Sequence, residues 1–190
     1  MQKLSSYFET LTVIFFILLN SFVISSCTEG AAKTIYLEKE GIVGDFKFEV
    51  GKDFLYYFSL SFHFPENNLA EQKRVRKILG GFQIDKNGKL LEPGTPTPLN
   101  LKIFATCRDG REVEVYSTDI DPILTSWDSR SYNKEIGNHS LTQGMYRAQV
   151  TNKRATSDFA GIPITFEFGM PAKVDYISTT DNTWRKLCTR

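Results

Sequence analysis

Between residues 34 and 168, short apolar runs rich in β-branched and aromatic side chains alternate with turn residues. This pattern is typical of an antiparallel β-sandwich or barrel. The clearest run is LYYFSLSFHF, in which every second side chain is large and apolar, so one face of the strand is aromatic and buried. The runs predicted to be strands are residues 34–39, 45–50, 55–64, 99–106, 112–118, 145–152 and 162–168.

One amphipathic helix is expected between the third and fourth of these strands. Asn68 can cap it, Glu71 stands three residues later as in a capping box, and Gly80-Gly81 end it. The apolar side chains of this helix gather on one side, so we expect it to lie on the sandwich and to turn a basic face outward. That basic face is a candidate partner-binding surface, formed by Lys73, Arg74, Arg76 and Lys77. The alternative is an ordinary solvated helix face.

Three segments are expected to be connections between these elements. DKNG at 85–88 is a turn, and EPGTPTP at 92–98 is a stiff extended connection. From Pro122 to Leu141 the pattern weakens into a polar stretch around Trp127, which predicts a loop with a short strand or a turn of helix. We find no internal repeat and no second domain.

The N-terminus carries an apolar stretch, LTVIFFILLNSFVI at 11–24, that is shorter than the roughly 20 residues of a membrane-spanning helix. The sequence ISSC that follows, ending at Cys27, resembles the lipobox of bacterial lipoprotein precursors. In those precursors the cysteine is acylated and becomes the new N-terminus. An ordinary signal peptide cut near Ser26, or an uncleaved N-terminal anchor, is the alternative.

The lipobox resemblance and the strand pattern together predict three segments: a signal peptide at 1–26, a lipidated tether at 27–33, and a single β-sandwich domain at 34–190. The lipobox resemblance also implies a lipid anchor on the bacterial outer membrane with the domain facing the periplasm, since Thr28 is not the Asp associated with inner-membrane retention. The choice between inner and outer membrane stays open.

Two further cysteines, Cys107 and Cys188, remain once Cys27 is acylated. The periplasm oxidises thiols, so the two are predicted to form a disulfide, which would contribute on the order of 4 kcal/mol by restricting the unfolded chain. The alternative is a buried strand thiol at Cys107 and a free thiol in the C-terminal tail.

A more specific indication of the fold is a short motif at the start of the strand predicted at 145–152. Gly144 and Tyr146 form a Gly-x-Tyr motif that resembles the tyrosine corner of immunoglobulin-like sandwiches, in which the phenol reaches back to the backbone between the sheets. A plain strand tyrosine is the alternative. Ala148 stands where antibody domains have a cysteine, so their inter-sheet disulfide is not expected.

Five segments of the chain carry a resemblance to a known family: 44–50, 55–64, 77–80, 92–103 and 144–173. In these segments the chain resembles a family of uncharacterised envelope lipoproteins of Gram-negative bacteria that share an immunoglobulin-like domain of unknown function. The resemblance implies a mainly β, immunoglobulin-like antiparallel sandwich with one inserted amphipathic helix, and it carries no catalytic residue to transfer. Some small lipoproteins of this architecture are immunity proteins that block secreted antibacterial effectors.

Composition excludes several function classes. The 23 basic and 22 acidic residues give a net charge of +1, which leaves no excess charge for a nucleic-acid backbone. Three Cys and two His are too few and too scattered for a zinc or iron–sulfur site, and the common nucleotide-binding and hydrolase motifs are missing. His63, His139 and the pair Asp119 and Asp121 are more consistent with solvated or turn residues. We therefore predict no catalytic residue, no metal and no cofactor.

These observations together predict a non-enzymatic, lipid-anchored periplasmic module that binds another protein. The partner we expect is a secreted antibacterial effector that the module neutralises, bound through the basic helix or an exposed loop in the region 127–139. The alternative is a structural envelope lipoprotein that contacts peptidoglycan or outer-membrane assembly machinery, and a hydrolase is the third candidate.

Overall fold

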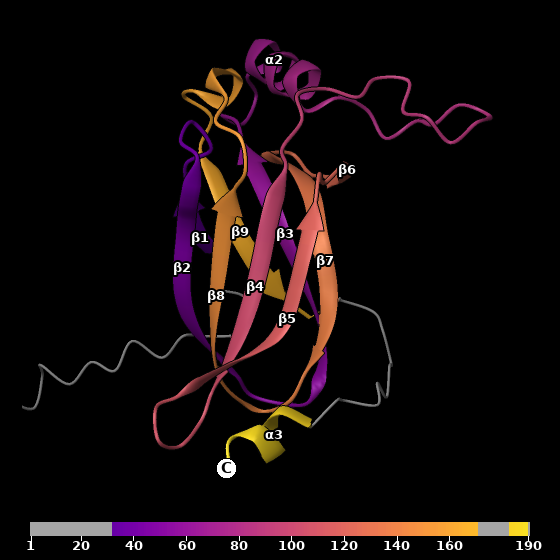
Figure 1. Cartoon of the computed structure of the whole chain (residues 1–190). Coiled ribbons are helices and arrows are strands. Elements are labelled where there is room, and N and C mark those ends of the chain that lie inside the picture. The colour runs from indigo at the N-terminus through magenta and orange to yellow at the C-terminus, as the bar shows by residue number, and fades with distance from the viewer. Residues whose placement is uncertain (1–31, 171–182, 190) are drawn as a thin grey trace, which may run out of the picture.

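The computed structural model describes residues 32–170 and 183–189. Two antiparallel sheets face each other (Figure 1), with strand orders β1-β9-β3-β7-β6 and β2-β8-β4-β5. The predicted β-sandwich is therefore confirmed. Its strands are β1 Ala32–Ile35, β2 Gly41–Val50, β3 Phe54–His63, β4 Leu99–Thr106, β5 Glu112–Ile120, β6 Leu124–Trp127, β7 Ser131–Leu141, β8 Gly144–Asn152 and β9 Ile164–Gly169; its helices are α2 Leu69–Leu79, η1 Ser157–Phe159 and α3 Thr183–Leu187.

The predicted signal peptide and the acylation site Cys27 lie outside the described residues. Within the described residues, none of the helices has both the length and the apolar character that a membrane span requires.

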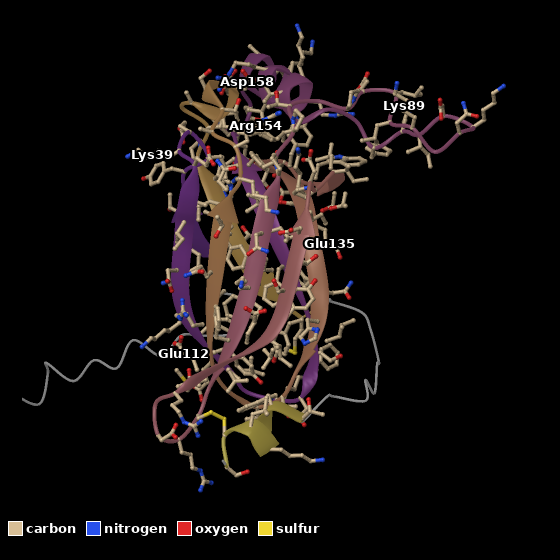
Figure 2. The ribbon with its side chains drawn as sticks, viewed as in Figure 1. Lys39, Lys89, Glu112, Glu135, Arg154 and Asp158 are labelled. Carbon is tan, nitrogen blue, oxygen red and sulfur yellow. A yellow bond between two sulfur atoms is a disulfide. The ribbon has the colours of Figure 1, made fainter. Side chains whose placement is uncertain are left out.

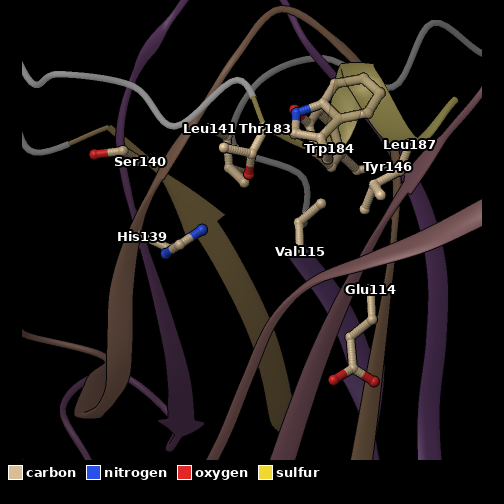
Figure 3. Close-up of a pocket in the computed structure, with 9 residues that line it drawn as sticks. All are labelled: Glu114, Val115, His139, Ser140, Leu141, Tyr146, Thr183, Trp184 and Leu187. Atoms are coloured by element: carbon tan, nitrogen blue, oxygen red, sulfur yellow. The ribbon is translucent and has the colours of Figure 1, made fainter. Parts of the chain in front are cut away.

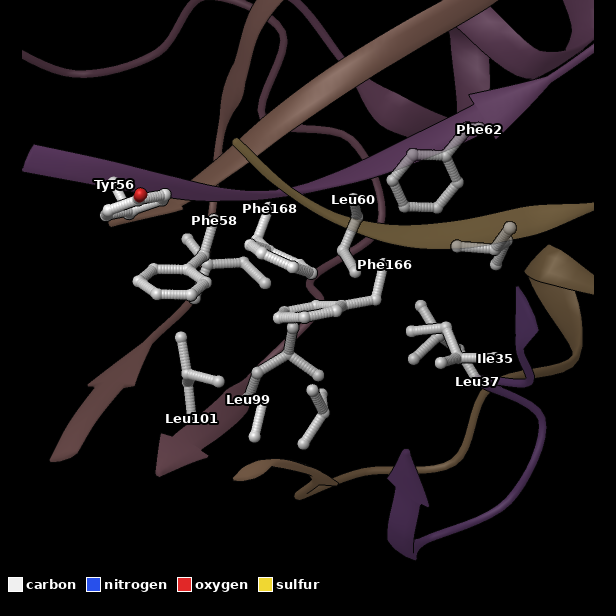
Figure 4. Packing of buried hydrophobic residues seen from close by; sticks show 14 of the residues in the cluster. Ile35, Leu37, Tyr56, Phe58, Leu60, Phe62, Leu99, Leu101, Phe166 and Phe168 are labelled. Carbon is white, nitrogen blue, oxygen red and sulfur yellow. The ribbon is translucent and has the colours of Figure 1, made fainter. Parts of the chain in front are cut away.

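One apolar core fills the space between the sheets (Figure 4). Its centre is the alternate row of β3 side chains that the sequence pattern indicated, and Tyr56, Phe58, Leu60 and Phe62 are all fully buried. From the neighbouring strand β9, Phe166 stacks on Phe58 with ring centroids 6.1 Å apart. Burial of each large apolar side chain contributes about 1.5–3 kcal/mol, so this row supplies much of the force that holds the sheets together.

The strand predictions agree with the structure in position and differ at some ends. The strand predicted at 34–39 is wrong in its second half, because the chain leaves β1 after Ile35 and crosses to the other sheet. At this crossing the Leu37 carbonyl accepts a hydrogen bond from the Asn152 side-chain amide at 2.9 Å. The sequence pattern predicts a solvent-exposed outer face for β3, but this face is largely covered, and Ser61 is only 2% exposed. The reason is that β3 is an interior strand, between β7 and β9.

The loop predicted from Pro122 to Leu141 is wrong: this stretch forms the antiparallel pair β6 and β7. β7 runs alongside β3 for its whole length and is an interior strand of its sheet. Its pattern is hard to recognise because an inward position carries Lys134 and because a bulge lies near Gly137, opposite Phe58 and Ser59. A lysine at a core position breaks the alternation of apolar and polar residues that marks a strand.

The crossing from β7 to β8 is fixed by Tyr146. Its buried hydroxyl donates a hydrogen bond to the Thr142 carbonyl, four residues upstream, at 2.7 Å. The ring also stacks on Phe48 of β2, with centroids 5.7 Å apart. These two contacts tie the turn between the two sheets to the core.

The end of the sandwich that holds this turn is covered by α3. A disulfide joins Cys107, just after β4, to Cys188, with Cα atoms 5.4 Å apart. Trp184 of α3 meets the Tyr146 ring edge-on at 6.0 Å, and the Arg185 guanidinium donates to the Gln143 carbonyl at 3.1 Å. The short helix is thus held by one covalent bond and a few contacts.

Removing the Tyr146 hydroxyl should destabilise the domain without changing its fold. The Tyr146→Phe variant leaves the buried Thr142 carbonyl without this donor, so we expect the free energy of unfolding to fall by about 1–3 kcal/mol. Urea denaturation measures this value. Tyr36→Phe, at a side chain that is 65% exposed, is the matched control and should change stability by less than about 0.5 kcal/mol. Equal losses in the two variants would contradict a structural role for the Tyr146 hydroxyl.

Breaking the disulfide should lower stability as well. In the Cys107→Ser/Cys188→Ser variant we expect a loss of about 2–4 kcal/mol, because the unfolded chain is no longer closed into a loop of 81 residues. A thiol assay on the denatured, unreduced wild-type protein should detect no free thiol at Cys107 or Cys188. Detection of two free thiols would show that the bond does not form in the cell.

Candidate functional site

Helix α2 follows β3 and precedes β4 in the sequence, and it lies at the end of the sandwich opposite α3 (Figure 1). Its start is capped as the sequence predicts, because the Asn68 side-chain oxygen accepts a hydrogen bond from the Glu71 amide at 3.1 Å. Val75 and Leu79 are buried against the core. The opposite side of the helix, with the four basic residues, faces outward.

The four basic side chains are not equivalent. Arg74 is bound by Glu71 one turn earlier, with Nε 2.9 Å from a carboxylate oxygen, and this hydrogen bond holds the pKa of Glu71 below its usual value. Arg76 donates to the Gly80 carbonyl and lies 3.5 Å from the Glu92 carboxylate. Lys73 and Lys77 have no side-chain partner among the described residues. The basic face therefore offers two uncompensated ammonium groups rather than four positive charges.

A groove of about 590 Å³ runs beside this face. One wall is α2, and the other is the connection that follows it, at Glu92 and Gly94. Glu92 places one carboxylate among the cations of the groove, and Tyr132 forms part of the lining. The residues that line the groove are Gln72, Lys73, Arg76, Lys77, Gly80, Glu92, Gly94 and Tyr132.

The two walls of the groove are held together by close backbone contacts. The Gly81 amide donates to the Glu92 carbonyl at 2.6 Å, and the Thr95 amide donates to the Ile78 carbonyl at 2.7 Å. Gly80 and Gly94 have positive φ angles of 80° and 65°, and a Cβ atom on either would collide with the backbone of the opposite wall. Glycine is therefore required on both sides for this close approach.

Lys134 lies buried beneath this connection. Its ammonium donates to the Thr97 hydroxyl at 3.1 Å and lies 6.0 Å from the centre of the Phe62 ring. Burial lowers the pKa of Lys134 from its usual 10.5 to about 8, although the charge of Asp121 opposes this shift. Asp121 in turn accepts a hydrogen bond from the Thr97 amide at 2.6 Å, so both groups hold the connection that forms the groove wall.

The histidines and paired acids singled out in the sequence do not come together. His63 is hydrogen-bonded to the Thr165 hydroxyl at 2.8 Å, on the outer face of its sheet. The His139 ring stacks on Tyr116, with centroids 4.6 Å apart. Asp119 forms an ion pair with Lys153 at 2.7 Å, whereas Asp121 binds the connection. In residues 32–170 and 183–189, no three His, Cys, Asp or Glu side chains are grouped as metal ligands.

A second, smaller cavity of about 100 Å³ lies beneath α3 (Figure 3). His139, Ser140 and Glu114 contribute to its walls, and Trp184 and Tyr146 close it. Figure 3 shows His139 and Glu114 on separate strands and well apart across the cavity. His139 and Ser140 are consecutive residues of β7, so their side chains leave opposite faces of this strand.

Comparison with known proteins places the chain in a family. The profile of a family described as a domain of unknown function (DUF5625) matches residues 32–170, which is the whole sandwich without α3. The chain therefore belongs to this family.

A crystal structure of a protein from Sulfurospirillum deleyianum shares the fold, with a TM-score of 0.64 and 18% sequence identity. The match covers 77% of this chain and 99% of the other one. No curated protein matches the chain in sequence.

The buried ammonium of Lys134 should reduce stability at neutral pH. Below pH 8 the lysine is charged in both the folded and the unfolded chain, so the folded state carries the full cost of burying the charge. Between pH 8 and 10.5 the unfolded chain binds the proton that the folded chain has lost, so stability rises with pH. We expect Lys134→Met to be more stable than wild type by about 1–3 kcal/mol at pH 7, and this difference should shrink toward pH 10.

Urea denaturation of both proteins across this pH range measures the difference. A Lys134→Met variant that is less stable than wild type by the same amount at every pH would contradict the assignment of a buried, destabilising charge.

Proposed function

We propose that this protein is a lipid-anchored envelope protein of a Gram-negative bacterium that binds another protein through the outer face of α2 and the groove beside it. One observation carries the proposal: Lys73 and Lys77 project beside a groove of about 590 Å³ and have no charge partner among the described residues. Unpaired cations beside a concave surface favour an acidic partner, because complementary charge speeds encounter and selects among partners.

The anchor is proposed from the lipobox that ends at Cys27. The first strand begins at Ala32, so the chain between the acylated cysteine and the domain would span at most about 17 Å. Such a short tether would keep the sandwich close to the membrane surface. Several acyl chains on one residue would make this attachment long-lived.

An immunoglobulin-like assignment of the fold is part of the same proposal. In the first sheet β3, β7 and β6 are neighbours in the order of strands B, E and D, and in the second β8, β4 and β5 follow the order F, C and C′. Tyr146 lies at the start of the strand equivalent to F, as a tyrosine corner requires. The outer strands differ, since β9 pairs with the B equivalent and β2 with the F equivalent.

The partner we propose is a secreted antibacterial effector, which the anchored domain would neutralise at the periplasmic face of the membrane. A structural role, in which the domain contacts peptidoglycan or assembly proteins, is the alternative. The two differ in the partner: a toxic enzyme in the first, and a resident envelope component in the second.

Affinity capture with the full-length chain, from the secreted and envelope fractions of its own cell, tests this function. Mass spectrometry should identify a secreted effector whose activity the chain inhibits. We expect Lys73→Glu/Lys77→Glu to weaken its binding by about tenfold or more, with little change in thermal stability. Lys33→Glu/Lys186→Glu is the matched control, because it changes the net charge equally at exposed sites away from the groove and should bind as wild type does.

Two results would count against the proposal. Capture of envelope components alone would favour the structural role. Equal binding by the two charge-reversed variants would remove the face of α2 from the interface.

A further inference from the structure

Exposed apolar side chains are concentrated in two short segments of the described chain. Of the ten large hydrophobic side chains that are exposed in the described residues, five come from the two short segments 82–91 and 123–127. Single exposed apolar residues are normal on protein surfaces, whereas a cluster of this kind marks an interaction site. These five residues are Phe82, Ile84, Leu91, Ile123 and Trp127, each 44–60% exposed. Phe82 and Ile84 are two residues apart and lie on the same face of the segment 82–91, and Trp127 stacks on Phe82. Phe82, Ile84 and Trp127 therefore form one patch, here called the apolar arm surface, whereas Leu91 lies opposite Gln83 on the other face.

The segment 82–91 is a hairpin-like arm that projects from the sandwich next to α2 (Figures 1 and 2). It is held by its own backbone, with a bridge between Ile84 and Leu90 and a hydrogen bond from the Leu91 amide to the Gln83 carbonyl at 2.9 Å. At its tip the Asp85 carboxylate accepts from the amides of Asn87 and Lys89 at 2.8 and 2.9 Å. The arm is therefore preformed, which reduces the entropy lost on binding.

The base of the arm is fixed to β6 by an aromatic pair. The rings of Phe82 and Trp127 stack with centroids 5.3 Å apart and planes 17° apart. Both side chains nevertheless remain about half exposed, so the pair forms a rigid aromatic platform open to solvent. Tryptophan in such a position is the residue type most enriched among side chains that dominate binding energy.

The acids next to this platform have partners, whereas lysines of the arm do not. Glu92, at the end of the arm, lies 3.5 Å from Arg76, and Asp128, which follows Trp127, accepts hydrogen bonds from the amides of Arg130 and Ser131. Lys86 and Lys89 on the arm have no side-chain partner among the described residues, and Lys73 and Lys77 lie on the adjacent helix. The acid at the tip of the arm, Asp85, accepts hydrogen bonds from the backbone of the turn, and these hold its pKa below the usual value. A ligand that covers the apolar arm surface would thus meet unpaired lysines at its rim.

We propose that the apolar arm surface docks an acidic segment of a protein partner, with the partner's aliphatic or aromatic side chains placed on the Phe82–Trp127 platform and its carboxylates near Lys86 and Lys89. This inference rests on the proposed protein-binding function and names the chemistry of the partner. The tip of the arm is polar, with Asp85, Lys86 and Asn87, while the apolar residues lie along its sides. A bilayer contact would have to bury this polar tip first, so a protein surface fits the arm better than a lipid one.

The test uses a phage library of random dodecapeptides, panned against the full-length chain. Enriched peptides should combine Asp or Glu with aliphatic or aromatic residues. In a Trp184→Phe background Trp127 is the only tryptophan of the chain, so its emission should shift to the blue when a peptide binds. Ile84→Ser should weaken peptide binding by about tenfold, and Lys86→Gln/Lys89→Gln should do the same and reduce the salt dependence of binding.

Ile42→Ser is the matched control, because Ile42 is 62% exposed and Ile84 is 60% exposed, and it should bind peptides as wild type does. Peptides without acidic residues, binding that survives Ile84→Ser, or a failure to enrich any peptide that depends on the arm would overturn the proposal. So would a blue shift of Trp127 on vesicles of phosphatidylglycerol and phosphatidylethanolamine without peptide, which would indicate a membrane contact. Self-association abolished by Ile84→Ser would instead indicate a second copy of the chain.

Failure of this inference can be told from failure of the proposed function. If the captured effector is still bound by Ile84→Ser but lost by Lys73→Glu/Lys77→Glu, the groove is the interface and the arm is not. If no protein is captured at all, the protein-binding function itself fails.

Discussion

The structure depends on the packing of the β3 aromatic row against the second sheet. β3 is paired on both sides, to β7 and to β9, and its inward side chains are fully buried. A strand in this position cannot shift by one residue, because such a shift would move the whole aromatic row to the solvent face. Because β7 and β9 both pair with β3, the register of β3 also fixes the registers of these two strands. The buried aromatic side chains of β3 therefore also determine where the loops at the ends of β7 and β9 begin.

Strong alternation made β3, β4, β8 and β9 predictable from the sequence, and the capping residues made α2 predictable. β7 could not be recognised because Lys134 takes an apolar position, where it is tolerated through its hydrogen bond to Thr97. The crossing after Ile35 was also missed, since the hydrogen bonds that replace the strand ladder come from Asn152, far along the chain. Long-range partners of this kind leave no local signal.

The candidate site was only partly visible in the sequence for the same reason. The basic residues of α2 were evident, but their pairing with Glu71 and Glu92 depends on side-chain geometry and on the fold of the following connection. The apolar arm surface was missed because its two segments are about forty residues apart and come into contact through the Phe82–Trp127 stack. The motif DKNG correctly indicated the turn at the tip of the arm, yet nothing local indicated that its flanking apolar residues stay exposed.

The two ends of the sandwich are built differently, and this difference bears on function. At one end, the disulfide and Trp184 hold α3 over Tyr146, so apolar surface is covered by the chain itself. At the other end, the backbone contacts between Gly80 and Gly94 hold α2 rigidly, but the arm beyond them leaves its aromatic pair open. Exposed apolar surface favours association, and a fixed framework lowers the entropy lost when a partner covers it. A fixed apolar platform with unpaired lysines nearby is therefore better suited to binding a protein partner than a flexible surface loop would be.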